Sequence, residues 1–356
     1  MATRRPSARP ASRSVRTDAA VADHDAARLA SCVQRFSGRR VVVLGDLVAD
    51  EFVYGDIARI SREAPVPILA HHKTVVVPGG GGNAVANLHA LGARPIPVGV
   101  VGRDEAGRRL LDEFKRRGIP RSAIRVAPGY CTPSKSRILA GGVHTRRQQI
   151  VRVDRGGSGG ELSRTTRVAV RRALRAALAR ADGLLVADYG YGAATPELVE
   201  GLRELRSIPV LVDSRSRVTE FRGATGCTPN QEELERALNL EPLADAAAVE
   251  SAGRKLLRRA EAQAVLVTRG ARGMCLFERS RKPVHVPAFG SDEVADVTGA
   301  GDTVIAAFTL ALLAGAGFPD AARLANYAAG LVVMKAGTAT VTAKELVAAV
   351  REDLAS

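Results

Sequence analysis

The chain has 356 residues and a mass of 37.4 kDa. This length excludes a small disulfide-stapled module and fits one large α/β domain that carries a small additional substructure. Hydrophobic residues make up 46% of the chain and charged residues 25%, so it can build a full core, and global disorder is excluded. The formal net charge is +15, from 52 basic and 37 acidic residues.

The N-terminal segment carries much of this positive charge. Residues 1 to 40 contain nine arginines and three aspartates. Arg, Ser, Ala and Pro dominate as far as about residue 21, and we predict a disordered basic tail over residues 1–37. Its composition resembles that of a transit peptide and equally that of an ordinary basic tail. No apolar segment of a signal peptide follows the arginines.

After Gly38, short β-branched runs alternate with stretches of helical length. The predicted strands are Val41–Leu44, Pro97–Val101, Gly183–Ala187, Val210–Val212 and Val265–Val267, and the predicted helices are Ala84–Leu91, Glu105–Arg117, Leu162–Arg180, Pro196–Arg206 and Ala246–Arg259. This alternation is typical of a parallel sheet covered by helices, so we predict one α/β domain over residues 38–356.

Two stretches interrupt the alternation. Phe52–Val77 and Thr132–Asp154 are polar and β-rich, with no helical period, so we predict that they form a small sheet standing off the main one. We call this sheet the lid.

The apolar and cysteine content excludes two further classes. The run Thr303–Ala316 is too short to span a bilayer and predicts a buried helix, so no membrane partner is expected. The four cysteines are far apart, which argues against a zinc site and a disulfide framework and favours a reducing cytoplasm.

The segment Asp296–Asp302, DVTGAGD, is the most informative part of the sequence. Gly299, Ala300 and Gly301 allow close backbone approach just before a helix whose first amides have no internal partner. Such a turn binds anions, and a carboxylate at Asp302 can take a proton from an attacking hydroxyl. The pattern leaves a second reading open, because Asp is also a preferred helix N-cap.

DVTGAGDTVIAAF resembles the C-terminal signature of the ribokinase-like (phosphofructokinase-B type) sugar kinases. Further family segments follow in order: GDLVAD (Gly45–Asp50), PGGGGNAVANLHALG (Pro78–Gly92), TPNQEE (Thr228–Glu233) and TRGARGM (Thr268–Met274). The likeness runs from about Val41 to Val350. It implies a ribokinase-like three-layer α/β/α core with a mainly parallel sheet and a small β lid. It also implies an ATP-dependent kinase in which Asp302 is the catalytic base and the glycines before it form the anion hole.

Other segments resemble heptose 7-phosphate kinases, the kinase half of ADP-heptose synthesis enzymes. They are ARISREAPVPIL (Ala58–Leu69), SKSRILA (Ser134–Ala140), QQIVRVD (Gln148–Asp154), ADYGYGA (Ala187–Ala193), VDSR (Val212–Arg215) leading to GATGCTPN (Gly223–Asn230), and ANYAAGLVVMKAGTATVT (Ala325–Thr342). The resemblance implies phosphorylation of the anomeric 1-hydroxyl of D-glycero-D-manno-heptose 7-phosphate. Bifunctional relatives carry a nucleotidyltransferase domain after the kinase. Because this chain ends at Ser356, we expect the kinase alone.

The resemblance also assigns residues to the sugar. Asp50 follows the first strand, on the edge where open α/β sheets place ligands, and matches the sugar-binding aspartate. Asp46 is a second candidate that could instead brace the strand end. The same likeness assigns Gly79, Gly80, Asn83, Asn87 and Asp188 to the sugar. A glycine turn and a polar helix start would explain most of these residues structurally.

A sugar phosphate needs cationic partners, and the lid strands supply Lys135, Arg137 and Arg152 as candidates. Solvated lid charges are the alternative. The chain also departs from the heptose kinase pattern: Tyr191 stands in place of a lysine, Arg103 in place of an acidic residue and Arg62 in place of a proline.

By the same resemblance, Asn230 and Glu233 form the family's NxxE motif, which positions Mg²⁺ and its waters beside the ATP phosphates. Asn three residues before Glu is also a helix-cap pattern. The residues carried over to the nucleotide side are Thr268, Gly270, Gly273 and Asn326.

Several partners and alternatives remain to be weighed. Arg164, Arg167, Arg171 and Arg175 share one face of a predicted helix, which we interpret as solvated rather than as a nucleic-acid site, because no nucleic-acid motif accompanies it. Lid strands in this family often pair between subunits, so a homodimer is expected. The alternatives to a heptose kinase are a related kinase of another sugar or sugar phosphate, and a non-catalytic sugar-binding protein of the same fold.

Overall fold

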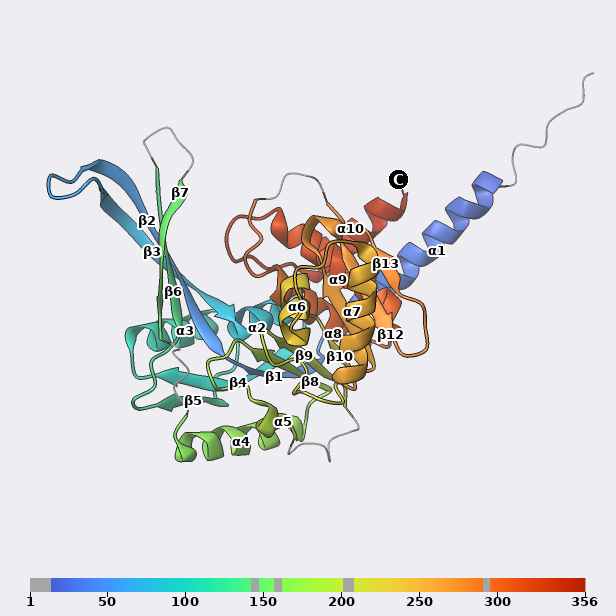
Figure 1. The fold of residues 1–356 in the computed structure, drawn as a ribbon, viewed down its shortest axis with the longest axis horizontal. Helices are drawn as coiled ribbons and strands as arrows, with labels where there is room; N and C mark the ends of the chain where they lie inside the picture. Colours follow the sequence, from blue (N-terminus) through green and yellow to red (C-terminus); the bar gives the residue numbers. More distant parts are fainter. Residues whose placement is uncertain (1–13, 142–146, 157–161, 201–207, 291–294, 356) are drawn as a thin grey trace, which may run out of the picture.

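The computed structural model describes residues 14–141, 147–156, 162–200, 208–290 and 295–355 (Figure 1). Its main sheet has nine strands in the order β13-β12-β11-β10-β9-β8-β1-β4-β5. These strands are β1 (Arg40–Gly45), β4 (Arg94–Gly102), β5 (Ile124–Ala127), β8 (Gly183–Asp188), β9 (Val210–Ser214), β10 (Gly226–Cys227), β11 (Ala264–Thr268), β12 (Met274–Glu278) and β13 (Val284–Val286).

The main sheet is parallel from β11 to β5, and only β12 and β13 pair antiparallel at one edge. In the register of the central strands, Val41 of β1 lies between Pro95 of β4 and Gly183 of β8. All six residues of β8 are buried, as expected of a strand covered on both faces. The five predicted strands and the parallel α/β architecture are therefore confirmed.

Helices cover both faces of this sheet. They are α1 (Ser14–Gln34), α2 (Gly81–Ala90), α3 (Glu105–Arg116), α4 (Arg164–Leu178), α5 (Pro196–Glu200), α6 (Gln231–Leu238), α7 (Ala246–Arg259), α8 (Ala300–Leu313), α9 (Phe318–Val333) and α10 (Ala343–Ala355), together with the short 3₁₀ turn η2 (Gly270–Arg272). The predicted helix Pro196–Arg206 is described only as far as Glu200, and its remainder lies outside the described residues.

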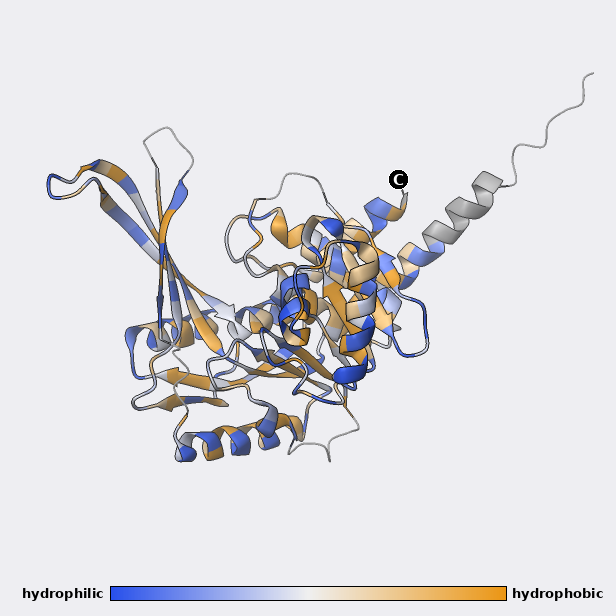
Figure 2. Ribbon diagram, viewed as in Figure 1, coloured by the Kyte–Doolittle hydropathy of each residue, from blue (hydrophilic) through white to orange (hydrophobic). Residues whose placement is uncertain are grey.

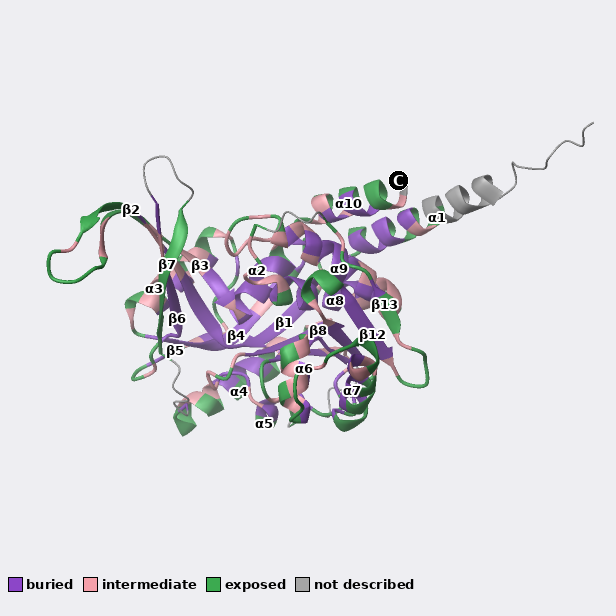
Figure 3. Ribbon diagram, turned by 45° about the horizontal axis from the view of Figure 1, so that its top comes forward, coloured by how far each residue is buried: buried purple, intermediate pink, exposed green. Residues whose placement is uncertain are grey.

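Each face of the sheet has its own apolar core. One contains Phe36, Leu88 and Phe308 beneath α1, α2, α3, α8, α9 and α10. The other contains Leu174 and Leu256 beneath α4 to α7. Figure 3 shows the buried sheet between the two layers and the exposed outer end of the lid.

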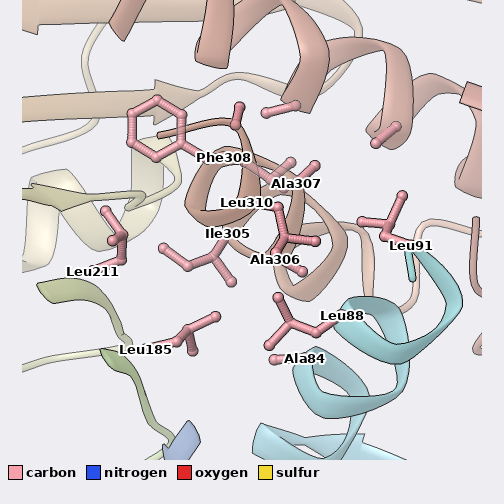
Figure 4. Packing of buried hydrophobic residues seen from close by; sticks show 14 of the residues in the cluster. Ala84, Leu88, Leu91, Leu185, Leu211, Ile305, Ala306, Ala307, Phe308 and Leu310 are labelled. Carbon is pink, nitrogen blue, oxygen red and sulfur yellow. The ribbon is translucent and has the colours of Figure 1, made fainter. Parts of the chain in front are cut away.

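Helix α8 runs through the interior, as the apolar run Thr303–Ala316 predicts. All its residues from Asp302 to Ala311 are buried. In Figure 4, Ala84 and Leu88 of α2 lie beside Ile305 and Ala306 of α8. Two helices are thus packed together with their N-terminal ends toward the same edge of the sheet, where their polar first turns can meet.

The lid is a four-stranded sheet in the order β3-β2-β6-β7 that projects from one end of the body (Figure 1). Its strands are β2 (Leu47–Ile60), β3 (Pro67–Gly80), β6 (Ser134–Gly141) and β7 (Gln148–Arg155). This confirms the small sheet predicted from Phe52–Val77 and Thr132–Asp154, although β2 begins earlier than predicted, directly after the first strand of the main sheet.

The N-terminal segment corrects one prediction. We expected a disordered tail over residues 1–37, but residues 14–34 form α1, and Leu29, Val33 and Phe36 are buried in the core. The spacing of four between Leu29 and Val33 gives α1 an apolar stripe, which Phe36 continues just beyond the helix and which the arginine-rich composition conceals. Arg35 Nε also donates to the carbonyl of Ala314, at the C-terminal end of α8, 3.0 Å away. Residues 1–13 lie outside the described residues.

The basic stripe of α4 lies on the surface. Arg164, Arg171 and Arg175 are exposed, and the hydrophilic and hydrophobic sides of the helix are distinct in Figure 2. This fits the solvated face that we expected. No helix in the described part of the chain is long and apolar enough to cross a membrane. All four cysteines are free.

Candidate active site

The candidate site lies at the carboxyl edge of the main sheet. β1, β8 and β9 end there and are followed by Asp46, Tyr189 and Arg215. The N-terminal turns of α2 and α8 face the same edge, and β2 carries Asp50 into the base of the lid. Open α/β sheets bind ligands at this edge, so the fold brings the predicted residues to a suitable place.

Asp302 occupies the first turn of α8 and is only 3% exposed. Its Oδ2 accepts from Asn83 Nδ2 at 2.9 Å, and its Oδ1 accepts from the Tyr189 hydroxyl at 2.7 Å. Burial raises the pKa of Asp302 to about 6, although both hydrogen bonds lower it. A carboxylate with a pKa near neutrality suits a general base.

The helix cap here is Gly299, not Asp302. Gly299 has φ 82°, and a Cβ atom on it would lie 2.4 Å from Asn83 Nδ2. Among the described residues, no acceptor receives a hydrogen bond from the backbone amides of Gly301 or Asp302. A Cβ placed on Gly301 would meet nothing within 4 Å. Free amides beside open space at a helix start form an anion-binding turn.

A chain of amides links this turn to α2. Asn83 Nδ2 also donates to the Gly299 carbonyl at 3.3 Å, and Asn87 Nδ2 donates to Asn83 Oδ1 at 3.2 Å. The Thr303 hydroxyl donates to Asn87 Oδ1 at 3.1 Å. Asn83 therefore contacts Asp302 directly, whereas the buried Asn87 orients Asn83.

Asp50 is buried and forms an ion pair with Arg137, whose Nη1 lies 2.8 Å from Asp50 Oδ1. A Cβ atom on Gly79 would lie 2.3 Å from Asp50 Oδ2, so any larger residue at position 79 would displace this carboxylate. Gly80 has φ 55° and lies next to Asp46. The structure brings these residues together as the resemblance implies, and Arg137 lies close to Asp50 rather than isolated on the lid.

Asp46 has a bracing geometry. Its carboxylate accepts from the backbone amides of Tyr189, Tyr191, Ala193 and Ala194, which belong to the loop after β8. It is completely buried, and burial raises its pKa although the amide hydrogen bonds oppose this. We therefore interpret Asp46 as the brace of this loop, the second of the two roles considered for it.

Asp188 was expected to bind the sugar, but both its oxygens are occupied by the protein. It accepts from the Ser214 hydroxyl at 2.7 Å and from Arg217 Nη2 at 2.6 Å, and the Gly190 amide donates to it at 3.0 Å. It is only 1% exposed. Asp188 therefore ties the ends of β8 and β9 together, and we interpret it as a positioning residue rather than a ligand.

The three predicted lid cations differ in their surroundings. Register pairs Asp50 with Lys135 and Arg137 with Arg152, so these side chains share one face of the lid. Arg152 is exposed and pairs with Asp154 on its own strand. Lys135 is only 9% exposed, its Nζ lies 5.7 Å from the centre of the Tyr189 ring, and no described residue accepts a hydrogen bond from it. Burial lowers its pKa.

Asn230 and Glu233 begin α6 as a capping box. Asn230 Oδ1 accepts from the Glu233 amide at 2.8 Å, and Glu233 Oε2 accepts from the Asn230 amide at 2.9 Å. The two residues therefore do cap the helix, as the alternative interpretation of this motif predicts. This cap still leaves Glu233 Oε1 without a described donor. Burial raises the pKa of Glu233.

The residues assigned to the nucleotide side are divided between two places. Asn230, Thr268 and Gly270 line one shallow pocket of about 410 Å³. Asn326 lines a different pocket, of about 550 Å³, and its Nδ2 donates to the Pro287 carbonyl at 2.8 Å. Gly273 closes the turn η2 with φ 73°.

Sequence reasoning missed Tyr189, Asp213 and Arg215. The Tyr189 hydroxyl donates to Asp302, and burial together with Asp302 raises the pKa of Tyr189 well above the usual value, so the hydroxyl stays a donor. Asp213 lies in β9 and Arg215 directly follows it. Burial, and after it the charge of Glu233, raises the pKa of Asp213. The available signals were their position, because each lies at or just after a strand end on the ligand edge, and their place in the segments ADYGYGA and VDSR.

Residues 39–345 match the family described as pfkB family carbohydrate kinase. The chain belongs to the pfkB family. It is therefore a phosphotransferase that acts on a sugar hydroxyl, and the resemblance inferred from the DVTGAGD segment is confirmed.

Curated relatives of this pfkB chain support the narrower likeness. The bifunctional protein HldE of Caulobacter vibrioides is 42% identical over 325 residues, which cover 90% of this chain and 65% of that protein. The bifunctional protein HldE of Geobacter sulfurreducens is 42% identical over 310 residues, covering 86% of this chain and 62% of the relative. The chain thus spans less than two thirds of the length of these relatives.

Solved structures confirm the ribokinase-like fold. Arabidopsis thaliana ribokinase complexed with ribose and ATP gives a TM-score of 0.66 at 21% identity, covering 88% of this chain and 99% of that one. Escherichia coli phosphofructokinase-2 in complex with fructose-6-phosphate gives a TM-score of 0.67 at 18% identity, and the match covers 90% of this chain and 100% of that one.

Proposed function

We propose that this pfkB-family chain is an ATP-dependent kinase that phosphorylates the anomeric 1-hydroxyl of D-glycero-D-manno-heptose 7-phosphate, giving the 1,7-bisphosphate. The observation that carries the proposal is the buried Lys135, which has no acceptor among the described residues and shares a lid face with Asp50. A neutral sugar gives such a cation nothing to neutralise, whereas a sugar phosphate does. The Ala58–Leu69 segment and the 42% identity to HldE proteins favour a heptose.

The proposed step moves one phosphoryl group. The sugar hydroxyl oxygen forms a bond to the γ-phosphorus while the bond from that phosphorus to the bridging oxygen breaks, and ADP leaves with the electron pair. Asp302 accepts the hydroxyl proton, and the amides of Gly301 and Asp302 stabilise the charge on the transferring group. Asp50 accepts hydrogen bonds from the sugar.

We propose that Mg²⁺ accompanies ATP near Glu233 and Asp213. No cluster of three or more His, Cys, Asp or Glu side chains within the described ranges could hold a metal alone. The two carboxyls nevertheless fit a cation, because Asp213 has no described hydrogen-bond donor and each has its pKa raised. Mg²⁺ keeps most of its waters and needs few protein ligands, and it would neutralise phosphate charge.

The acceptor assignment predicts a clear order of substrates. In a coupled assay of ADP release, heptose 7-phosphate should be turned over with the highest kcat/KM, ahead of fructose 6-phosphate and ribose. NMR of the product would identify the phosphorylated oxygen and its anomer. Faster turnover of fructose 6-phosphate or ribose would replace the heptose assignment, and no ADP release with any acceptor would favour a binding protein.

Lys135→Met extends this test to the phosphate. Its KM for heptose 7-phosphate should rise by roughly tenfold or more, since a charged hydrogen bond contributes about 1.5 to 3 kcal/mol. Lys73→Met is the matched control, because Lys73 is also a lid lysine beside a tyrosine ring, 5.3 Å from the ring centre of Tyr54, but is exposed. An equal effect of both variants would refute a phosphate contact at Lys135.

The pKa of Asp302 predicts the pH profile. A base must be ionised, so kcat/KM should rise with pH and level off above the pKa of about 6. Tyr189→Phe removes a hydrogen bond that lowers this pKa, and should move the acidic limb upward by roughly one pH unit. Tyr191→Phe, on the same loop but without a described bond to Asp302, should leave the limb in place. A downward or absent shift in Tyr189→Phe would contradict the base assignment.

We propose that two copies of the chain pair through their lids to form a homodimer. We also propose that the protein works in a reducing cytoplasm. The feature that supports the dimer is a set of exposed apolar side chains on the lid strands and hairpin: Ile57, Ile60, Val66, Val75, Ile150, Val151 and Val153, each between 36% and 59% exposed. Light scattering at micromolar concentration should give the mass of two chains, and Ile60→Asp should reduce it toward one. A wild-type monomer under these conditions would exclude this dimer.

A further inference from the structure

Arg215 follows β9 on a turn whose backbone is fixed from several sides. Its amide donates to the Asp188 carbonyl at 3.1 Å, and its carbonyl accepts from Arg236 Nη1 at 2.8 Å. The Arg217 amide also donates to the Ser214 hydroxyl at 3.0 Å. The hydrogen bonds around Asp188 therefore hold this turn in one place beside the loop that carries Tyr189.

The Arg215 side chain is exposed, yet it has a defined position. Its guanidinium carbon lies 4.5 Å from the centre of the Tyr189 ring, a cation–π arrangement. The hydroxyl of the same ring bonds Asp302. No described carboxylate or carbonyl accepts a hydrogen bond from this guanidinium, so all its donors are available to a ligand.

The charge of Arg215 acts on both sides of the site. It lowers the pKa of Asp302 on the acceptor side and of Glu233 on the side of α6, against the larger effect of burial. It also lowers the pKa of Lys135, as the second cause after burial. The charge of Arg215 thus acts on both Asp302 and Glu233, and its contact with the Tyr189 ring holds the guanidinium beside the residue whose hydroxyl bonds Asp302.

From this arrangement we infer that Arg215 is a further catalytic residue, whose guanidinium contacts the transferring phosphoryl group and stabilises the charge on its equatorial oxygens. The inference rests on the kinase activity of the pfkB family and, for its location, on the roles proposed above for Asp302 and Glu233. It does not depend on the acceptor being a heptose.

The chemistry suits a guanidinium at this point. As the bond from the sugar oxygen to the γ-phosphorus forms and the bond to the leaving ADP breaks, negative charge spreads over the three equatorial oxygens. The planar guanidinium can donate to two of these oxygens at once. The face of the Tyr189 ring contacts the guanidinium, and the Tyr189 hydroxyl donates to Asp302. A single side chain therefore aligns the cation and the base.

The test compares kcat with KM in Arg215→Ala. We expect kcat to fall by roughly 100-fold or more, the usual loss when one preorganised donor to a transition state is removed, with KM for ATP and acceptor changed by less than about threefold. Arg215→Lys should keep part of the rate, because the charge remains. Guanidinium ion added to Arg215→Ala should restore part of kcat.

Two controls make the result specific. Arg171→Ala removes the same charge from the exposed face of α4 and should leave kcat unchanged. Guanidinium ion should not rescue Asp302→Asn. Since the exposed Arg215 side chain makes no described hydrogen bond and only a cation–π contact, Arg215→Ala should lower the midpoint of thermal unfolding only slightly, which separates a catalytic loss from a folding defect.

The contrary outcomes are equally distinct. A higher KM for a phosphorylated acceptor with unchanged kcat would assign Arg215 to ground-state binding of the substrate phosphate and overturn the inference. A kcat that is unaffected would also overturn it. The wild type is assayed first with heptose 7-phosphate, fructose 6-phosphate and ribose, and the variants with whichever is turned over. If none of the three acceptors is turned over, the rate of ATP hydrolysis by wild type and variants is compared instead. Failure of the heptose assignment therefore leaves the Arg215 test intact.

Discussion

Asp302→Asn is expected to lower kcat by roughly two to four orders of magnitude, the usual contribution of a positioned general base, while substrate binding is largely retained. The asparagine amide has nearly the same shape: its oxygen can accept from Asn83, and its NH2 group can donate to the Tyr189 hydroxyl, which is able to accept as well as donate. It cannot accept the hydroxyl proton, however, so only the chemical step suffers. Steady-state kinetics with the best acceptor, together with calorimetric binding of ATP, separate these two quantities.

The same variant should not be less stable than the wild type. Burial holds the pKa of Asp302 in the folded state at about 6, above the ordinary value of 3.8. Because the carboxyl pKa is higher in the folded state, ionising Asp302 lowers the free energy of unfolding. This loss of stability is absent below about pH 4 and complete above about pH 6. At about pH 8, a neutral asparagine removes a cost of the order of 1 to 3 kcal/mol. Urea unfolding would measure this difference.

Asp182→Asn provides the matched control. Asp182 accepts from the Arg40 amide at 2.7 Å, is 31% exposed and lies at the opposite end of the sheet from the site. It should retain wild-type kcat. Turnover of Asp302→Asn within about threefold of the wild type would remove Asp302 from the role of base. Loss of turnover accompanied by unfolding would refute the stability argument.

The sequence predicted the fold well where local pattern and burial agree. The runs Val41–Leu44 and Gly183–Ala187 are apolar throughout because both faces of a parallel sheet are covered, and they appear as β1 and β8. It failed at α1, where average composition outweighed a short apolar stripe. It also missed β10, which has only two residues and is defined by its neighbours β9 and β11.

The candidate site was partly predictable for a similar reason. Asp302, Asn83 and Gly299 belong to contiguous motifs, so their chemistry can be read locally, and the structure brings them into contact. Tyr189 and Arg215 belong to segments that carry the resemblance, but nothing in those segments assigns a chemical role to either side chain. Their roles depend on the order of β8 and β9 in the sheet and on the orientation of a ring, which spacing along the chain does not specify.

Residue type also cannot separate a ligand from a brace. Asp46, Asp50 and Asp188 are all carboxylates at or near strand ends, and the sequence made each a sugar-binding candidate. Only their hydrogen bonds distinguish them: Asp46 is occupied by backbone amides, Asp188 by Ser214 and Arg217, and Asp50 by one arginine. A carboxylate that is fully satisfied by the protein has little capacity left for a sugar hydroxyl.

The bracing role of Asp46 predicts a large loss of stability in Asp46→Ala. Four backbone amides of the loop after β8 would lose their acceptor in a completely buried position. Each unsatisfied buried donor costs about 1 to 3 kcal/mol, and water entering the cavity offsets part of this, so we expect a net loss of about 3 to 5 kcal/mol in the free energy of unfolding. Urea unfolding measures this loss.

Asp46→Asn should lose less, because one of the two acceptor oxygens remains while the new amide group faces backbone donors. Both variants should also lower kcat, since the loop that they release carries the Tyr189 hydroxyl bonded to Asp302. Asp182→Ala, which removes one acceptor at a half-exposed position, is the stability control and should cost less than about 1.5 kcal/mol. If Asp46→Ala unfolded like this control but raised the KM for the acceptor sharply, Asp46 would be a sugar ligand and not a brace.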